Sequence, residues 1–204
     1  MSARRDEILL IAAEIFAEKG FSATTMRDIA DAAGMLPGSL YHYFESKEAM
    51  VDEIVLTFVE EAAAKYAGIA EAIDDPLEAL QELIRAAFGI IVTQRAAYTV
   101  AHNESHYLLQ FKPFAHLRTG FRAIDATWMS VLQRGIDAGV FKADLDVQFI
   151  YLLVREAVWV SARLVTRNRQ YKVDELSDAY VAFVLDGIRV TGAASRRRTP
   201  RPSG

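Results

Sequence analysis

The sequence has no cysteine, only five prolines among its 204 residues, and no long uninterrupted apolar run. Without cysteine the chain can form no disulfide and offers no thiolate to a metal, which fits a reducing compartment. No apolar run approaches the roughly 20 residues that a membrane-spanning helix needs. The N-terminus leads into a short amphipathic pattern and not into a signal peptide. These absences predict a soluble, cytoplasmic protein that does not bind membranes.

The sequence also lacks the motifs of common catalytic sites, with no Gly-x-Ser-x-Gly, no phosphate loop and no carboxylate pair with a supporting base. His102 and His106 are four residues apart, a spacing that can chelate a metal. Because no third ligand is evident, we expect these histidines to form hydrogen bonds, face water or line a ligand pocket. We predict no catalytic residue, no metal site and no cofactor.

What the sequence does contain is helical periodicity, without an alternating pattern that would predict a β-strand. Hydrophobic residues make up 52% of the chain, which is ample for a core. We therefore predict an all-α fold of about nine helices. The expected helices are residues 4–19, a short helix from Thr25 to Gly34, a second short helix opening at 36–39, and then 46–70, 77–92, 96–109, 113–138, 145–166 and 173–190.

Residues 24–50 have the pattern of a helix-turn-helix. Thr25, with Asp28 three residues later, predicts a reciprocal cap at a helix start, and Gly34 permits the positive φ that ends this helix. Pro37 suits the first turn of a second helix, where its missing N–H costs nothing, and Ser46 predicts the cap of a third. Two short helices joined by a tight glycine turn are the arrangement that enters a DNA major groove.

Side chains around the second short helix divide into an inner and an outer set. Leu40 and Phe44 are four apart and are predicted to pack inward, whereas Tyr41 and His42 are predicted on the outside. Ordinary packing is the alternative role for the aromatic residues, and for Phe44 we adopt it. Lys47 lies beside the N-terminus of the third helix, where helix dipole and cation both favour a phosphate.

The pattern TT-RDIA-AAG---GSLYHYF-SKE-M within residues 24–50 resembles the DNA-binding domain of the TetR family of bacterial one-component repressors. This resemblance implies a homodimer on a palindromic operator in double-stranded DNA. It also implies two sets of contact residues. Phosphates would be held by Thr25, Tyr41, His42 and Lys47, and the bases would lie nearest Leu36, Pro37, Gly38 and Ser39.

The charge balance also favours a dimer. The chain has 23 basic and 27 acidic residues, a formal net charge of −4, and acids outnumber bases even within residues 1–50. Because non-specific affinity for DNA comes from phosphate neutralisation, a single copy should bind weakly, and two copies on a palindrome would compensate. Arg4 and Arg5 could reach the minor groove or flanking phosphates, or could simply be solvated.

The remainder of the chain predicts a helical bundle with an interior ligand site. Arg155, Trp159 and Arg163 are spaced four apart and lie along one stripe of an otherwise apolar helix. Two guanidinium groups flanking an indole could hold an anionic ligand with a flat ring. Alternatively, the arginines could pair with Glu156, Asp125 or acids of a partner subunit, since arginine is also enriched at ordinary interfaces.

The last helix is apolar over more of its surface than one buried face requires. Such a surplus is what an isologous dimer interface would cover, although a hydrophobic core explains part of it. We predict that this interface contains Tyr180, Val181, Val184, Leu185 and Ile188.

The combination of three stretches, GSLYHYF-SKE-MVDE, DPLE-L and RGID-GVF--DLDVQFIYLLVREAVWVSAR, is similar to the branch of TetR repressors that controls sterol-ring degradation in mycobacteria, rhodococci and their relatives. The resemblance implies an acyl-CoA effector, with Arg163 and Trp159 at the nucleotide or phosphate part and Arg155 nearby. The apolar acyl portion would then lie among Phe88, Ile91, Tyr107, Leu108, Phe121 and Trp128.

Together these patterns predict three segments: a DNA-binding domain at residues 1–47, an effector-binding and dimerisation domain at 48–192, and a disordered basic tail at 193–204. The predicted function is that of a transcriptional repressor released from its operator by a small amphipathic effector. The alternative is a repressor of the same kind that responds to another hydrophobic ligand, such as a fatty acyl-CoA, a free fatty acid or a drug.

Overall fold

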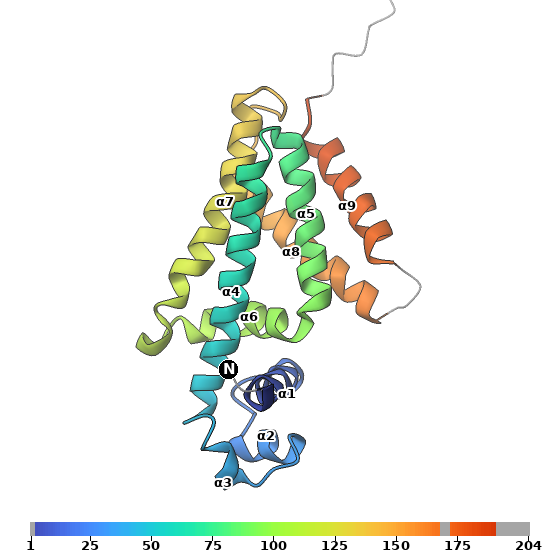
Figure 1. The fold of residues 1–204 in the computed structure, drawn as a ribbon. Coiled ribbons are helices and arrows are strands. Elements are labelled where there is room, and N and C mark those ends of the chain that lie inside the picture. The colour runs from blue at the N-terminus through green and yellow to red at the C-terminus, as the bar shows by residue number, and fades with distance from the viewer. Residues whose placement is uncertain (1–2, 168–171, 191–204) are drawn as a thin grey trace, which may run out of the picture.

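The computed structural model describes residues 3–167 and 172–190, and within 162–167 it describes only the backbone. Over these residues the chain forms nine α-helices and one 3-10 helix, which confirms the predicted all-α fold (Figure 1). The predicted disordered tail, 193–204, lies outside the described residues. The helices are α1 Ala3–Lys19, α2 Met26–Ala32, α3 Pro37–Leu40, α4 Lys47–Ala72, α5 Pro76–Thr93, α6 Arg95–Leu108, η1 Lys112–Phe114, α7 Leu117–Asp137, α8 Val147–Arg167 and α9 Val173–Ile188.

The start of α7 is the clearest difference from the predicted boundaries. Sequence periodicity placed a helix from Pro113 onward, but Pro113 lies in η1 and α7 begins at Leu117. Phe114 is buried, and its backbone N–H donates to the carbonyl of Phe111 at 3.2 Å. The buried ring therefore holds the chain in a tight turn before the long helix can begin.

The helices form two parts that share α4. Helices α1, α2 and α3 gather around the first turns of α4 at one end of the molecule, and α4 continues into a larger bundle with α5 to α9 (Figure 1). Ile8, Phe16, Ile29, Leu40 and Met50 are almost wholly buried in the smaller part. Because α4 runs unbroken for 26 residues, the two parts are joined by a helix and not by a loop.

Helix α6 crosses the lower end of the larger bundle and packs against α1 as well as α4 and α5 (Figure 1). Helix α7 packs against α4, and at Gly120 of α7 an added Cβ would lie 2.4 Å from Val59 Cγ1 of α4. A glycine at this position lets the two long helices lie close together. The smaller part is thus supported by both α4 and α6.

The far end of the bundle is closed by the ring of Phe141, which is 1% exposed. Phe141 forms an isolated antiparallel bridge with Arg189, next to hydrogen bonds from Lys142 N–H to the carbonyl of Ile188 at 2.9 Å and from Val190 N–H to the carbonyl of Val140 at 3.0 Å. This bridge fastens the end of α9 to the α7–α8 connection, a contact between distant segments that helical periodicity does not predict.

We predict that Gly135→Ala destabilises the fold. A Cβ at Gly135 would lie 2.1 Å from two carbons of the Phe141 ring, which is buried and has no room to move. Overpacking of this kind costs about 1–3 kcal/mol, so thermal denaturation at one fixed protein concentration should show a clearly lower melting temperature. Gly68→Ala is the matched control, since nothing lies within 4 Å of its added Cβ and alanine favours a helix. Equal melting temperatures for the two variants would contradict the prediction.

Among the described residues, none of the helices combines the length and the apolar content needed to cross a membrane.

Candidate functional site

The helix-turn-helix is built by local capping, as the sequence predicts. The Thr25 side chain accepts from the N–H of Asp28 at 3.1 Å, and the Asp28 carboxylate accepts from the N–H of Thr25 at 2.8 Å, so the reciprocal cap is confirmed. Gly34 has a φ of 64°, in the region that favours glycine, and ends this unit. The cap therefore fixes the start of α2, and Gly34 provides the turn that leads from α2 to α3.

The short helix α3 presents an exposed surface away from the rest of the chain. Leu36 is 76% exposed and Tyr41 is 55% exposed, and His42 is exposed beside them, whereas Leu40 and Phe44 are buried. The inward role of Leu40 and Phe44 is therefore confirmed. Of the other residues expected near the DNA, Thr25 and Gly38 are exposed and Pro37 and Ser39 are half-buried, and contact of the whole set with DNA stays a prediction.

The ammonium of Lys47 is engaged within the protein. It donates to the carbonyls of Phe21 and Thr24, both at 2.9 Å, and lies 4.5 Å from the centre of the Phe21 ring. The latter is the geometry of a cation–π contact. Lys47 thus fastens the first residue of α4 to the loop between α1 and α2, and its predicted contact with a phosphate stays a prediction.

Arg4 and Arg5, which could have been solvated, both bind groups of the same domain. Arg4 donates to the carbonyl of Ala33 at 2.6 Å, and Arg5 pairs with Glu53 while its guanidinium lies 4.5 Å from the centre of the Phe44 ring. These two arginines tie α1 to the end of α2 and to α4, so the small domain is held as one rigid piece.

The pKa of Asp28 offers a test of its reciprocal cap with Thr25. The Thr25 hydroxyl, then the Lys19 ammonium at 3.0 Å and the Thr25 N–H, donate to the carboxylate and lower the pKa of Asp28 to about 2. Because this folded pKa is below the ordinary value, the contribution is present above about pH 4 and is lost as the pH falls toward 2. We expect a carboxyl-carbon NMR titration to give about 2 for the wild type and a clearly higher pKa in Thr25→Val. An ordinary pKa in the wild type would contradict this.

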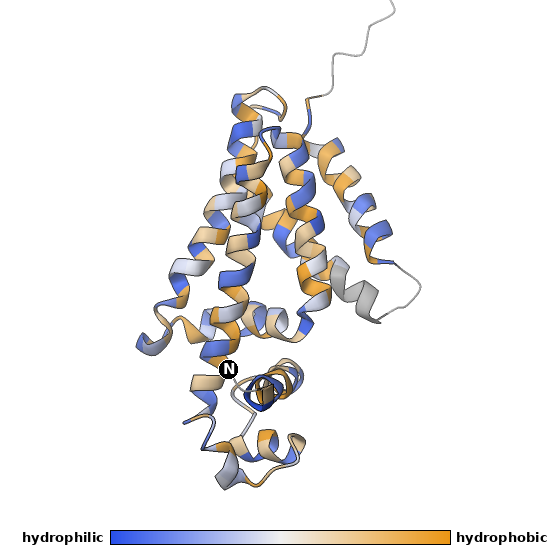
Figure 2. Cartoon of the chain, viewed as in Figure 1, coloured by the Kyte–Doolittle hydropathy of each residue, from blue (hydrophilic) through white to orange (hydrophobic). Residues whose placement is uncertain are grey.

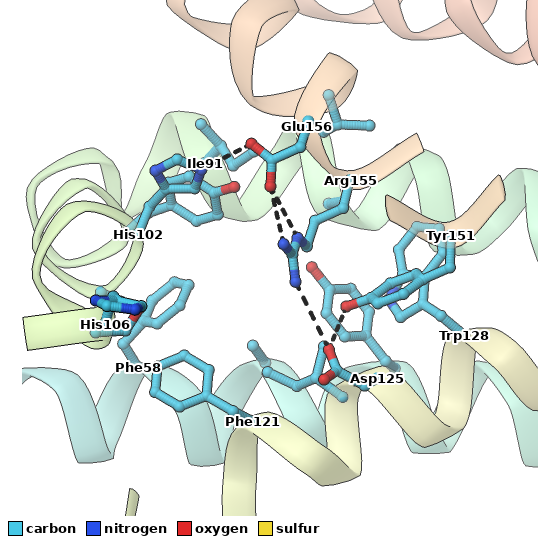
Figure 3. Close-up of a pocket in the computed structure, with 18 residues that line it drawn as sticks. Phe58, Ile91, His102, His106, Phe121, Asp125, Trp128, Tyr151, Arg155 and Glu156 are labelled. Carbon is cyan, nitrogen blue, oxygen red and sulfur yellow. Dashed lines mark hydrogen bonds and ion pairs between the residues drawn. The ribbon is translucent and has the colours of Figure 1, made fainter. Parts of the chain in front are cut away.

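A second candidate site is a cavity of about 340 Å³ inside the larger bundle, toward the lower end of the usual size range for ligand pockets (Figure 3). Five helices line it. The lining residues are Phe58, Ala62 and Tyr66 of α4, Ala87 and Ile91 of α5, Tyr98, Ala101, His102, Ser105 and His106 of α6, Phe121, Ile124, Asp125 and Trp128 of α7, and Tyr151, Arg155, Glu156 and Val158 of α8.

A chain of polar contacts runs along one side of this cavity, from α6 through α8 to α7 (Figure 3). His102 Nε2 lies 3.2 Å from Glu156 Oε2, and Arg155 donates to Glu156 Oε1 at 2.9 and 3.1 Å. Arg155 also lies 3.9 Å from Asp125, which accepts from the Tyr151 hydroxyl at 2.6 Å. The sequence left open whether Arg155 pairs with acidic residues. The structure shows that it pairs with Glu156 and Asp125 of its own chain.

Burial and hydrogen bonding shift the pKa values of two groups in this polar chain, Glu156 and Tyr151, in opposite directions. Burial would raise the pKa of Glu156, but hydrogen bonds from Arg155 and His102 outweigh it and lower the pKa. Burial, together with the hydrogen bond to Asp125, raises the pKa of Tyr151 well above its ordinary value. At neutral pH the cavity wall therefore holds an ionised Glu156 carboxylate and a protonated Tyr151 hydroxyl.

The predicted ligand residues are divided between the cavity and the packing around it. Those that line the cavity are Ile91, Phe121, Trp128 and Arg155. Phe88 and Leu108 are fully buried in the core, and Tyr107 is exposed and packs edge-on against Phe111, so these three do not line it. Arg163 lies in α8, but its side chain is outside the described part of the structure.

Trp159 lies behind the cavity wall. Its ring is 7% exposed and lies 4.8 Å from the ring of His102 and 4.9 Å from that of Tyr98, centre to centre. Trp159 therefore supports two side chains that line the cavity and is itself absent from the lining. Sequence reasoning missed four aromatic lining residues, Phe58, Tyr66, Tyr98 and Tyr151, although Tyr151 lies about one helical turn from the predicted Arg155 on α8.

His102 and His106 both line the cavity, which agrees with the pocket role left open for them. His102 contacts Asn103 and Glu156, and His106 contacts Gln110 at 3.3 Å. Among the residues the structure describes, no group of three or more histidine, aspartate or glutamate side chains could hold a metal ion.

The structure changes the predicted dimer surface. Val181, Val184, Leu185 and Ile188 are 4–8% exposed because they face the core of their own chain, and the Tyr180 hydroxyl donates to the carbonyl of Val154. The four buried side chains are not available to a second copy, and Tyr180 is half-buried. Among the described side chains of α8 and α9, the large apolar residues that are exposed are instead Phe149, Leu152, Leu153, Val160 and Phe183.

Figure 2 shows the resulting distribution along α9, which is hydrophilic near its first residues and largely hydrophobic toward its last. Phe183 is 76% exposed although it lies in that hydrophobic stretch. Contiguous exposed apolar patches are typical of surfaces that a partner covers, and Phe183 with the exposed apolar residues of α8 are the candidates for such a surface here.

Comparison with known proteins agrees with both parts of the fold. Residues 8–54 match the bacterial regulatory proteins of the tetR family, and residues 73–188 match the tetracyclin repressor-like C-terminal domain. The chain is 39% identical over 192 residues to the HTH-type transcriptional repressor KstR2 of Mycobacterium tuberculosis, covering 94% of this chain and 96% of that protein.

The KstR2 repressor of Rhodococcus jostii is 40% identical over 190 residues, covering 92% of each chain. The solved structure of the ketosteroid transcriptional regulator KstR2 of Mycobacterium tuberculosis superposes with a TM-score of 0.84 at 38% identity, covering 94% of this chain and 97% of that one.

Proposed function

Because the chain belongs to the TetR family of transcriptional repressors and is KstR2-like over most of its length, we propose that a coenzyme A thioester of a sterol-ring fragment releases it from its operator. The repressor acts as a homodimer, with one α3 in each of two adjacent major grooves. Its effector occupies the cavity of the larger domain.

The observation that carries this proposal is that one helix belongs to both sites. Helix α4 begins at Lys47, three residues after the buried Phe44, and carries Phe58 and Tyr66 into the cavity wall. A ligand that binds better to one orientation of α4 favours that orientation, and α3 moves with it. The change in operator affinity is limited by that difference in ligand binding.

The cavity chemistry suits an apolar ring system with a polar attachment. Phe58, Tyr66, Phe121 and Trp128 supply aromatic surface, and the His102–Glu156–Arg155–Asp125 contacts supply donors and acceptors along one side. The ketosteroid regulator among its relatives supports a sterol-ring fragment as the apolar part. Two carboxylates at the wall would disfavour a ligand whose buried end is itself anionic.

The test is fluorescence anisotropy of the purified protein on the palindrome upstream of its own gene, at fixed salt. A sterol-ring-derived acyl-CoA is titrated in parallel with free coenzyme A and with the free acid. Release by the thioester alone supports the proposal. Tight operator binding that none of the three disturbs would refute the sterol thioester while leaving the DNA-binding role in place.

A further inference from the structure

Leu36 has an apolar side chain that the fold itself does not use. It is 76% exposed, and it is not among the apolar residues that pack in the core or against it. Leu36 precedes α3 at the position where serine, threonine, aspartate or asparagine usually caps a helix, and its side chain forms no capping hydrogen bond. Its backbone does contribute, because its carbonyl accepts from the N–H of Ser39 at 2.9 Å. A side chain that neither packs nor caps indicates a function outside the fold.

Gly38 is a second residue that the fold does not require. It lies inside α3, which forms the outer end of the smaller part of the molecule (Figure 1), and it is exposed without a positive φ. An added Cβ would meet nothing within 4 Å, and alanine would favour the helix more than glycine does. Glycine leaves the backbone of α3 bare two residues after Leu36, so another molecule can approach it closely.

The surface of α3 lacks the side chains that read bases by paired hydrogen bonds. Residues 36–43 contain no arginine, lysine, asparagine or glutamine, which bind guanine or adenine through two hydrogen bonds at once. The nearby Lys47 donates to the carbonyls of Phe21 and Thr24. Arg27, which is 83% exposed, could supply such a pair, but it belongs to α2. Paired hydrogen bonds therefore cannot account for base reading by α3 itself.

We propose that Leu36 contacts the 5-methyl group of a thymine in each half-site of the operator and so specifies thymine there. In the major groove, the methyl group of thymine is the base feature that an apolar side chain recognises. The contact removes apolar surface of both partners from water, and this is favourable. This inference rests on the DNA-binding role of the family and on two copies of the chain at each operator, and not on the identity of the effector.

The experiment replaces thymines of the upstream palindrome by deoxyuridine, which lacks only the 5-methyl group, one symmetric pair at a time. Operator anisotropy is measured at fixed salt, without effector, for the wild type and for Leu36→Ser. In the wild type, at least one pair should lower the affinity about fifteenfold, which corresponds to about fourfold for each lost methyl contact. In Leu36→Ser the same pair should change the affinity by less than about twofold, because the contact is already absent.

Two controls accompany this comparison. The serine of Leu36→Ser can cap α3, so this variant should melt at the wild-type temperature or above it. Leu10→Ser is the matched control, since Leu10 is 70% exposed but lies on α1, and it should keep the wild-type response to deoxyuridine. Any effect of deoxyuridine on DNA shape would persist in Leu36→Ser, so the difference between the two proteins isolates the methyl contact.

Equal responses to deoxyuridine in the wild type and in Leu36→Ser at every position would overturn the inference, and so would a wild type that no replacement affects. A wild type that does not bind the unmodified palindrome would overturn it together with the operator role. Because no effector is present, a failure of the sterol thioester to release the operator would be seen only in the release titration and would leave this result in place.

Discussion

Leu153→Glu is expected to convert the dimer into monomers and to lower affinity for the palindromic operator by at least about 100-fold. Leu153 is 51% exposed, and Phe149 and Val160 lie four residues before it and seven after it on the same stripe of α8. In an isologous interface each substitution acts twice, so two glutamates would be desolvated near the symmetry axis.

The loss of operator affinity follows from the loss of the dimer, because a monomer cannot bind two half-sites at once. Sedimentation velocity and operator anisotropy measure the two effects.

Phe111→Glu is the control for this variant. Phe111 is also a large exposed apolar residue, but it lies in the turn before η1, where its ring packs against Tyr107, and not on α8 or α9. It should therefore remain dimeric with near wild-type affinity for the operator. A dimeric Leu153→Glu that still binds the operator tightly would show that this stripe of α8 is not the interface.

Glu104→Ala is expected to uncouple the effector from DNA. Helix α6 turns His102, Ser105 and His106 toward the cavity, while Glu104, on its opposite side, accepts from the N–H of Phe21 at 3.2 Å. The carbonyl of Phe21 is bound by Lys47 at the start of α4. These contacts connect the cavity wall to the small domain by a route that does not run along α4. Hydrogen bonds to a carboxylate are worth about 1.5–3 kcal/mol, so the effector-induced change in operator affinity should shrink about tenfold.

The comparison is between Glu104→Ala and Glu104→Gln, because glutamine keeps an oxygen that can accept from Phe21. Operator anisotropy with and without the effector gives the coupling factor for each variant. The expected pattern is a small change in operator affinity without effector, a reduced coupling factor for alanine and near recovery for glutamine. A coupling factor in the alanine variant equal to that of the wild type would show that α4 alone carries the signal.

The helix-turn-helix could be predicted from the sequence because its determinants are local. Thr25 and Asp28 cap each other across three residues, and Gly34 needs only its own φ to end the unit. No distant contact competes with these preferences. The roles of Lys47 and Arg5 could not be seen in the same way, since their partners Phe21 and Glu53 are 26 and 48 residues away.

The cavity and the dimer surface were predicted less well for the same physical reason. Periodicity shows that α9 is apolar but not which side meets α5 and α8, so Val181 and Leu185 were assigned to a partner although the core of their own chain covers them. In α6, Tyr98 lines the cavity whereas Leu108 is buried in the core. Which of the two faces the cavity depends on the arrangement of the five helices around it, which periodicity does not show. Arg155 could be singled out from the sequence because charge on an apolar helix is unusual. The structure places it in the cavity lining, and its contact with a ligand stays a prediction.

The bridge between Phe141 and Arg189 has a practical consequence for measuring this protein. It holds the chain at Val190 beside the α7–α8 connection, at the end of the larger bundle opposite α3 (Figure 1). An affinity tag or a fluorescent protein attached beyond that point starts far from the surface that faces the operator. Immobilisation on a sensor through such a tag should leave α3 facing solution, so operator kinetics can be recorded with the protein on the chip and the DNA in flow.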